Sequence, residues 1–124
     1  LGESVIYEYE SATNKNDKIF LQKISKKFED LIEKDKNSLY LNYYGYILID
    51  HDLNAKKGMK YIKLALELEP DSSYFLDSLA WGYYKLGECE KSLSVILEAM
   101  KLEGGKDPEV LKHYEIIKKC KGKK

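Results

Sequence analysis

Arginine is absent from this chain of 124 residues, and all 21 basic residues are lysine. The chain therefore lacks the planar guanidinium fork that phosphate and carboxylate sites most often use. The 21 acidic residues balance the lysines to a net charge of zero, so no overall field draws the chain onto nucleic acid or a membrane surface. We expect no nucleic-acid partner. For the lysine-rich end over 118–124 we expect at most a weak contact with polyanions.

Long apolar runs are also missing. None approaches the roughly 20 residues that span a bilayer, so we expect no membrane insertion. The chain opens at Leu1 without a methionine or a signal-like segment, and we expect it to be part of a longer or processed protein. Cysteine is scarce, and Cys89 and Cys120 have neither the spacing of a zinc knuckle nor the density of a disulfide scaffold. The pattern predicts a buried thiol at Cys89 and an exposed one at Cys120, and it leaves a disulfide between them open.

The residues that could carry chemistry do not form a known catalytic or metal pattern. His51 and His113 lie far apart without zinc-site spacing. We interpret His51 as part of an inter-helix turn, where its ring contacts helix C-terminal carbonyls, and His113 as part of an exposed helix face. The GGKDP stretch over 104–108 lacks the frame of a phosphate loop, and the Asp-His-Asp cluster over 50–52 has no paired nucleophile. We therefore expect no enzyme activity, no metal and no cofactor.

Apolar residues recur at three- and four-residue steps along most of the chain, and no segment alternates like a strand. This periodicity predicts helices over about 3–12, 17–35 and 39–50, and helical stripes over 59–66, 76–83, 93–100 and 110–117. Asp71 or Ser72 is expected to cap a helix that begins near Ser73, and Gly87 is expected to end it. The predicted fold class is all-α, with about six to seven helices.

The helical hairpins repeat. Gly45 aligns with Ala80, Gly58 with Ser92, Ala65 with Ala99 and Leu68 with Leu102, at spacings of 35, 34, 34 and 34 residues. A unit of about 34 residues with two antiparallel helices is typical of an α-solenoid, in which each hairpin covers the apolar face of its neighbour. The predicted organisation is a degenerate hairpin over 1–36, repeats over 37–70 and 71–104, a capping helix over 105–120 and a basic tail over 121–124.

The segment over 76–103 resembles the tetratricopeptide repeat. The residues that carry the resemblance are Leu79-Ala80, Tyr83, Leu86-Gly87, Ser92, Ile96 and Ala99, with Pro70 at the family's repeat-ending proline. The preceding unit matches at Tyr44-Gly45, Gly58, Ile62 and Ala65, with one extra residue between its helices. The pairing of LDSLAW with LNYYGY also resembles terminal repeats of bacterial envelope-associated members. That likeness favours the periplasm, while the residues alone leave cytoplasm and periplasm open.

In such solenoids the first helix of each hairpin lines a concave groove. The resemblance places nine residues on this inner face: Asn42, Tyr46, Ile49 and Asp50 in one helix, and Tyr74, Asp77, Trp81, Tyr84 and Lys85 in the next. Large aromatic rings bordered by polar groups suit peptide recognition. The resemblance therefore implies a scaffold that binds a protein or peptide partner in this groove.

Three further interpretations bear on the groove. Asn42, Asp77 and Ser78 stand at positions where the family's carboxylate-clamp members need Lys and Arg, which disfavours an acidic C-terminal peptide. Trp81 and Tyr84 have an alternative role, packing against an adjoining helix. The chain as a whole also has an alternative role, as a structural, self-associating segment of a longer solenoid.

Overall fold

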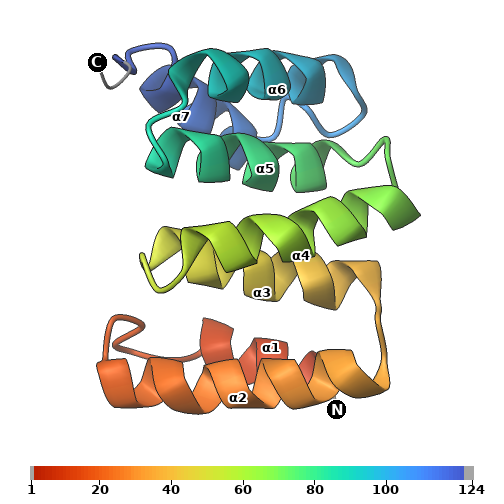
Figure 1. The fold of residues 1–124 in the computed structure, drawn as a ribbon, viewed down its shortest axis with the longest axis vertical. Coiled ribbons are helices and arrows are strands. Elements are labelled where there is room, and N and C mark those ends of the chain that lie inside the picture. The colour runs from red at the N-terminus through yellow and green to blue at the C-terminus, as the bar shows by residue number, and fades with distance from the viewer. Residues whose placement is uncertain (1, 122–124) are drawn as a thin grey trace.

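A computed structural model describes residues 2–121, and over these residues it contains seven α-helices and no strand. The helices are α1 (Gly2–Glu10), α2 (Lys18–Lys34), α3 (Ser38–Asp50), α4 (Ala55–Leu68), α5 (Ser73–Lys85), α6 (Cys89–Lys101) and α7 (Pro108–Ile117). The first six form three antiparallel hairpins stacked in chain order, with α7 beside α6 at the end of the stack (Figure 1). The prediction of an all-α chain of stacked hairpins is confirmed. Leu1 and residues 122–124, which make up most of the expected basic tail, lie outside the described residues.

The first helices of successive units begin at side-chain caps that keep the repeat in register. Asn37, Ser72 and Asp107 precede α3, α5 and α7, and the side chain of each accepts a hydrogen bond from a backbone N–H of the first turn. The caps lie 35 residues apart, so residues 35 apart occupy equivalent places in these three helices. Ser72, rather than Asp71, is the cap, and Gly87 ends the α5 region with a positive φ of 80°.

Small residues bring the two helices of the second and third hairpins, α3–α4 and α5–α6, close together. A Cβ atom at Gly45 would lie 2.7 Å from the carbonyl oxygen of Gly58, and a Cβ atom at Gly58 would lie 2.5 Å from that of Gly45. In the equivalent pair of α5 and α6, Ser92 Oγ donates to the carbonyl oxygen of Ala80 at 2.7 Å. Two of the aligned pairs, Gly45 with Ala80 and Gly58 with Ser92, therefore lie where the helices of a hairpin approach closely.

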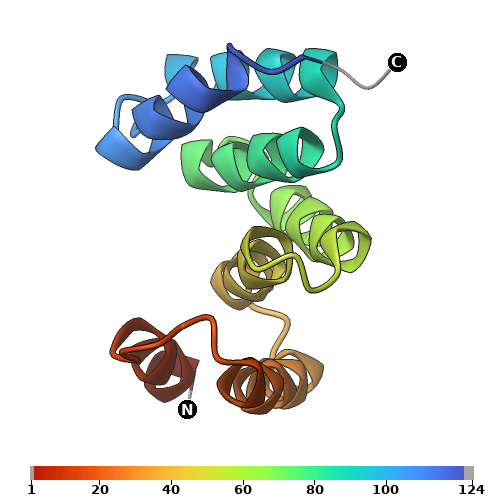
Figure 2. The same cartoon turned by 90° about the vertical axis from the view of Figure 1, so that its left-hand side faces the viewer.

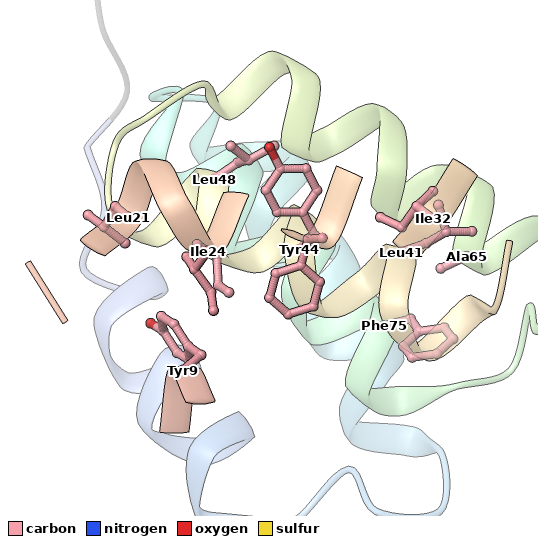
Figure 3. Packing of buried hydrophobic residues seen from close by; sticks show 11 residues of the cluster. Tyr9, Leu21, Ile24, Ile32, Leu41, Tyr44, Leu48, Ala65 and Phe75 are labelled. Atoms are coloured by element: carbon pink, nitrogen blue, oxygen red, sulfur yellow. The ribbon is translucent and has the colours of Figure 1, made fainter. Parts of the chain in front are cut away.

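Two apolar clusters fill the stack. The first lies mainly among α1, α2 and α3 and contains Ile24, Phe28 and Tyr44, with the Phe28 and Tyr44 rings stacked at a centroid distance of 5.6 Å. Figure 3 shows side chains of this cluster, among them Ile24 and Tyr44. The second lies among α3 to α7 and contains Ile62 and Ile96, both fully buried. None of the helices described over residues 2–121 is both long and apolar enough to cross a membrane.

The first hairpin is fastened to the rest of the stack by tyrosine and histidine side chains. The Tyr9 ring meets the Tyr43 ring edge-on at a centroid distance of 6.0 Å, and the Tyr9 hydroxyl donates to His51 Nε2 at 2.7 Å. His51 Nδ1 donates in turn to Asn16 Oδ1 at 3.0 Å. The His51 ring thus bonds to residues of the first hairpin, not to the helix carbonyls expected from the sequence. These contacts hold the end of α1 beside α3.

The last helix is held in two ways. It packs against both α5 and α6, with Val110 and Ile117 buried. Cys89 at the start of α6 and Cys120 beyond α7 also form a disulfide. The pairing that the sequence left open is therefore present, and the predicted free thiols are replaced by a covalent link across the α6–α7 unit.

Candidate functional site

A cleft of about 490 Å³ lies on the side of the stack formed by the first helices of the hairpins. In Figure 2, α1 and α7 project to the same side of the stack, with α3 and α5 between them. The cleft is lined from these four helices and from the loop after α1, by Tyr9, Glu10, Lys15, Asn42, Tyr43, Tyr46, Ile47, Asp50, Tyr74, Ser78 and Glu109. Four of the nine predicted groove residues are among them: Asn42, Tyr46, Asp50 and Tyr74.

The cleft is aromatic and acidic. Three carboxylates line it, from Glu10, Asp50 and Glu109, against a single ammonium group from Lys15. That ammonium group is already engaged, because it donates to the carbonyl oxygens of Glu10 at 2.9 Å and Ala12 at 3.0 Å. Within residues 2–121 no salt bridge pairs any of the three carboxylates with a lysine or histidine. The cleft therefore carries unneutralised negative charge.

The acidic groups of the cleft influence one another. Burial and, to a smaller extent, the charges of Asp50 and Glu10 together raise the pKa of Tyr9 to about 12. Burial also raises the pKa of Glu109 above its ordinary value, an effect that nearby carboxylates including Asp50 strengthen and His113 opposes. An additional anion is thus unfavourable here, and a cation is favourable.

Next to the cleft, a buried polar network closes the junction between α5 and α7. His113 Nδ1 donates to the two carboxylate oxygens of Asp77 at 2.9 and 3.0 Å, and the Tyr46 hydroxyl lies 3.4 Å from His113 Nε2. The Trp81 ring stacks on the imidazole at a centroid distance of 4.3 Å, and its Nε1–H donates to Asp50 Oδ1 at 3.1 Å. Burial raises the pKa of Asp77, and the hydrogen bond from His113 opposes that rise.

Several predicted groove positions are covered. Ile49 is 0 % exposed, Asp77 2 % and Trp81 9 %, so the prediction that they face an open groove is wrong. Ile49 packs in the core cluster, and α7 packs against α5, where its His113 covers Asp77 and Trp81. The alternative role for Trp81, packing against an adjoining helix, holds because its ring stacks on His113 of α7. The predicted exposure of His113 is wrong for the same reason, since its side chain fills this junction.

The two remaining predicted residues, Tyr84 and Lys85, do not line the cleft. They border a shallow open hollow near Cys120, and Lys85 Nζ lies 3.2 Å from Asp52 Oδ1. The nine predicted residues therefore divide into four at the cleft, three buried and two at the other end of α5.

The cleft lies at the contact between α3 and α5, which lacks a side chain that the equivalent contact between α5 and α7 has. Ser78 in α5 and His113 in α7 are 35 residues apart and equivalent, as are Asn42 in α3 and Asp77 in α5. His113 bonds to Asp77, whereas Ser78 Oγ donates to the carbonyl oxygen of Tyr74 in its own helix at 3.2 Å. Asn42 Oδ1 is consequently buried without a hydrogen-bond partner among the described residues. A buried acceptor of this kind is costly unless something satisfies it.

Tyr9, Tyr43 and Glu109 line the cleft although sequence reasoning did not select them. Tyr9 and Glu109 come from α1 and α7, outside the two well-formed repeats, and their positions depend on how those helices dock. Tyr43 precedes the Tyr44-Gly45 pair, and only its aromatic character marked it in advance.

Chemically, the cleft presents carboxylate and amide acceptors among tyrosine faces, an arrangement suited to binding. Within residues 2–121 no group of three or more His, Cys, Asp or Glu side chains is placed to hold a metal ion. No protein-family model matches this chain, and no curated protein matches it in sequence.

Proposed function

We propose that this chain is a protein-interaction module of the tetratricopeptide type, which binds a peptide or a partner helix in its concave groove. The cleft between α1, α3, α5 and α7 is the observation that carries the proposal. Its volume falls within the range of about 300–1,000 Å³ that is usual for sites enclosing a ligand. The resemblance at the small residues Gly45, Gly58, Ala80 and Ser92, each at a close helix contact, supports the repeat type.

The cleft tyrosines suit this role. Tyr46, Tyr43 and the half-exposed Tyr74 offer large rigid surfaces with few rotatable bonds, so they bury area at a low entropic cost. Asn42 and Asp50 line the same cleft, and the Asp50 carboxylate can accept hydrogen bonds from the N–H groups of a bound segment. Such a mixture of aromatic surface and directed polar groups favours an extended peptide, whose side chains and backbone use both.

The walls of the cleft are fixed before a partner arrives, which lowers the cost of binding. The hydrogen bond from Tyr9 to His51 holds α1 against α3, and the Asp77–His113 pair holds α7 against α5. The Cys89–Cys120 disulfide adds a covalent tie at the far end of α7. It also supports an oxidising compartment such as the periplasm for this protein, because disulfides are rare where thiols are kept reduced.

The proposal is tested by selecting peptides from a random displayed library on the immobilised protein, followed by fluorescence polarisation with the selected peptides. Tyr74→Ala removes an exposed cleft ring, and Asn42→Trp fills the cleft. Tyr7→Ala is the matched control, because Tyr7 is an exposed helical tyrosine that does not line the cleft. Circular dichroism melts establish that each variant is folded.

Selected peptides should lose affinity for the two cleft variants and keep it for the control. Equal affinity for all three variants would place the peptides outside the groove and overturn the proposal. It would also be overturned if light scattering showed concentration-dependent dimers that Tyr74→Ala abolishes, because the groove would then bind a second copy of the chain.

A further inference from the structure

We propose that the cleft selects a basic side chain, arginine or lysine, from the segment it binds, and holds it between Asn42, Asp50 and Glu109. This inference rests on the proposed peptide-binding function and adds the chemical class of the partner. It follows from three features of the cleft: its charge, its aromatic walls and the unpartnered amide oxygen of Asn42.

The charge of the cleft favours a cation. Asp50 and Glu109 come from α3 and α7, line one cleft together and have no ion-pair partner among residues 2–121. Burial and mutual repulsion raise the pKa of Glu109, so a bound ammonium or guanidinium group would relieve a repulsion that already exists. Asp50 accepts one bond from Trp81 Nε1 at Oδ1, and that bond fixes its carboxylate in place.

The tyrosine rings strengthen this preference. Tyr9, Tyr43, Tyr46 and Tyr74 line the same cleft as the carboxylates. A cation over an aromatic face gains electrostatic attraction from the ring quadrupole, and an anion loses it. Lys15 illustrates this within the chain, with its Nζ 5.7 Å from the centroid of the Tyr9 ring. Its ammonium group bonds to the carbonyls of α1 and the following loop, so it forms no ion pair with the cleft carboxylates in the described part of the chain.

The equivalent contact between α5 and α7 contains an example of such an interaction within the chain itself. There the N–H of His113 donates to Asp77, and the ring lies between Trp81 and the Tyr46 hydroxyl. In the cleft, the equivalent of Asp77 is Asn42, whose oxygen has no partner, and the equivalent of His113 is the short Ser78. A planar or cationic N–H donor from a partner fits this position. The terminal torsion of an asparagine is soft, so its amide can turn to present the oxygen.

The test uses groove-dependent peptides from the selection described above, in which each basic residue is replaced by an uncharged counterpart. Citrulline replaces arginine and norleucine replaces lysine, which keeps the size of the side chain and removes its charge. On the protein side, Asp50→Asn and Glu109→Gln remove the two carboxylates. Glu90→Gln and Glu98→Gln remove two exposed carboxylates of α6 as a matched control.

We expect one basic residue in each peptide to dominate, with its replacement raising Kd at least about tenfold, the usual size of a lost charged hydrogen bond. The cleft double variant should show a similar loss that diminishes at high salt, and the α6 double variant should bind like wild type. Ser78→His should block the same peptides, because it supplies the imidazole that the cleft lacks.

The outcomes separate this inference from the function on which it rests. If peptides depend on Tyr74 and Asn42 but tolerate citrulline and norleucine, the groove binds peptides and the basic-residue preference is wrong. If no selected peptide depends on Tyr74 or Asn42, the proposed function itself fails and this inference fails with it.

Discussion

The glycine pair at the α3–α4 contact allows a quantitative test of the repeat architecture. Ala in place of Gly ordinarily stabilises a helix interior by about 1 kcal/mol, because glycine loses more backbone entropy on folding. At Gly45, however, the added Cβ would lie 2.7 Å from the carbonyl oxygen of Gly58, where ordinary contact begins at 3.4 Å. The helices would have to separate by about 0.7 Å to relieve this contact, because the oxygen belongs to the backbone. Cγ1 of the fully buried Ile62 would also lie 2.7 Å from the added Cβ.

We expect Gly45→Ala to destabilise the protein, which is the opposite of the usual effect of this substitution in a helix. Overpacking of a tight core contact costs about 1–3 kcal/mol, and at a backbone-to-backbone contact we take the upper part of that range. After the propensity gain, the net loss in the free energy of unfolding is about 1–2 kcal/mol. For a chain of this length, that loss corresponds to a fall in Tm of roughly 4–8 °C.

The assay is urea unfolding followed by circular dichroism, with Gly82→Ala as the matched control. Gly82 is also buried within a helix, but the atom nearest its added Cβ is Sδ of Met59, which lies on a flexible side chain. The control should therefore stay within about 1 kcal/mol of wild type. A Gly45→Ala protein as stable as wild type, or more stable, would refute the claim that this contact sets the distance between α3 and α4.

Two further predictions concern the disulfide and acid stability. Replacing Cys89 and Cys120 by Ser should lower the free energy of unfolding by about 3–4 kcal/mol in the chain-entropy treatment of a 31-residue separation, and urea unfolding of reduced wild type should show the same loss. The hydrogen bond from Lys57 lowers the pKa of Glu29 below its ordinary 4.5, so the unfolded chain binds more protons as the pH falls. The stability that this hydrogen bond contributes is present above pH 4.5, and it is lost as the pH falls through the pKa of Glu29 in the folded protein. Wild type should therefore lose stability below pH 4.5 more steeply than Glu29→Gln, while Glu33→Gln should follow wild type.

The helices could be predicted because their signals are local. The expected helix over 17–35 matches α2 at Lys18–Lys34, and both end residues of the expected range serve as its caps. Ser72 and Gly87 bounded the helix predicted to begin near Ser73 for the same reason, since a cap bonds within one turn. The disulfide was left open, because whether two cysteines meet depends on how α7 docks, and no local pattern encodes that docking.

The groove residues were harder to predict, because the position of a residue in a repeat does not determine its exposure. Asn42 and Asp77 hold equivalent positions on α3 and α5, yet Asn42 lines the cleft and Asp77 is buried. Their exposure differs because the next helix contributes Ser78 opposite Asn42 and His113 opposite Asp77. The sequence contained both residues, but the pairing between neighbouring helices became visible only in three dimensions.

This dependence on the following helix has a consequence for how such a stack acquires specificity. Helix α5 packs against α3 and α7 packs against α5, and the side chain contributed at the equivalent position of the next helix determines whether the facing polar group is satisfied. At α5 the imidazole of His113 satisfies Asp77 and closes the face. At α3 the hydroxyl of Ser78 turns back to its own helix, and the unsatisfied Asn42 remains at the cleft. The proposed binding site therefore lies where α5 contributes the short Ser78 in place of the imidazole that α7 contributes at the equivalent contact.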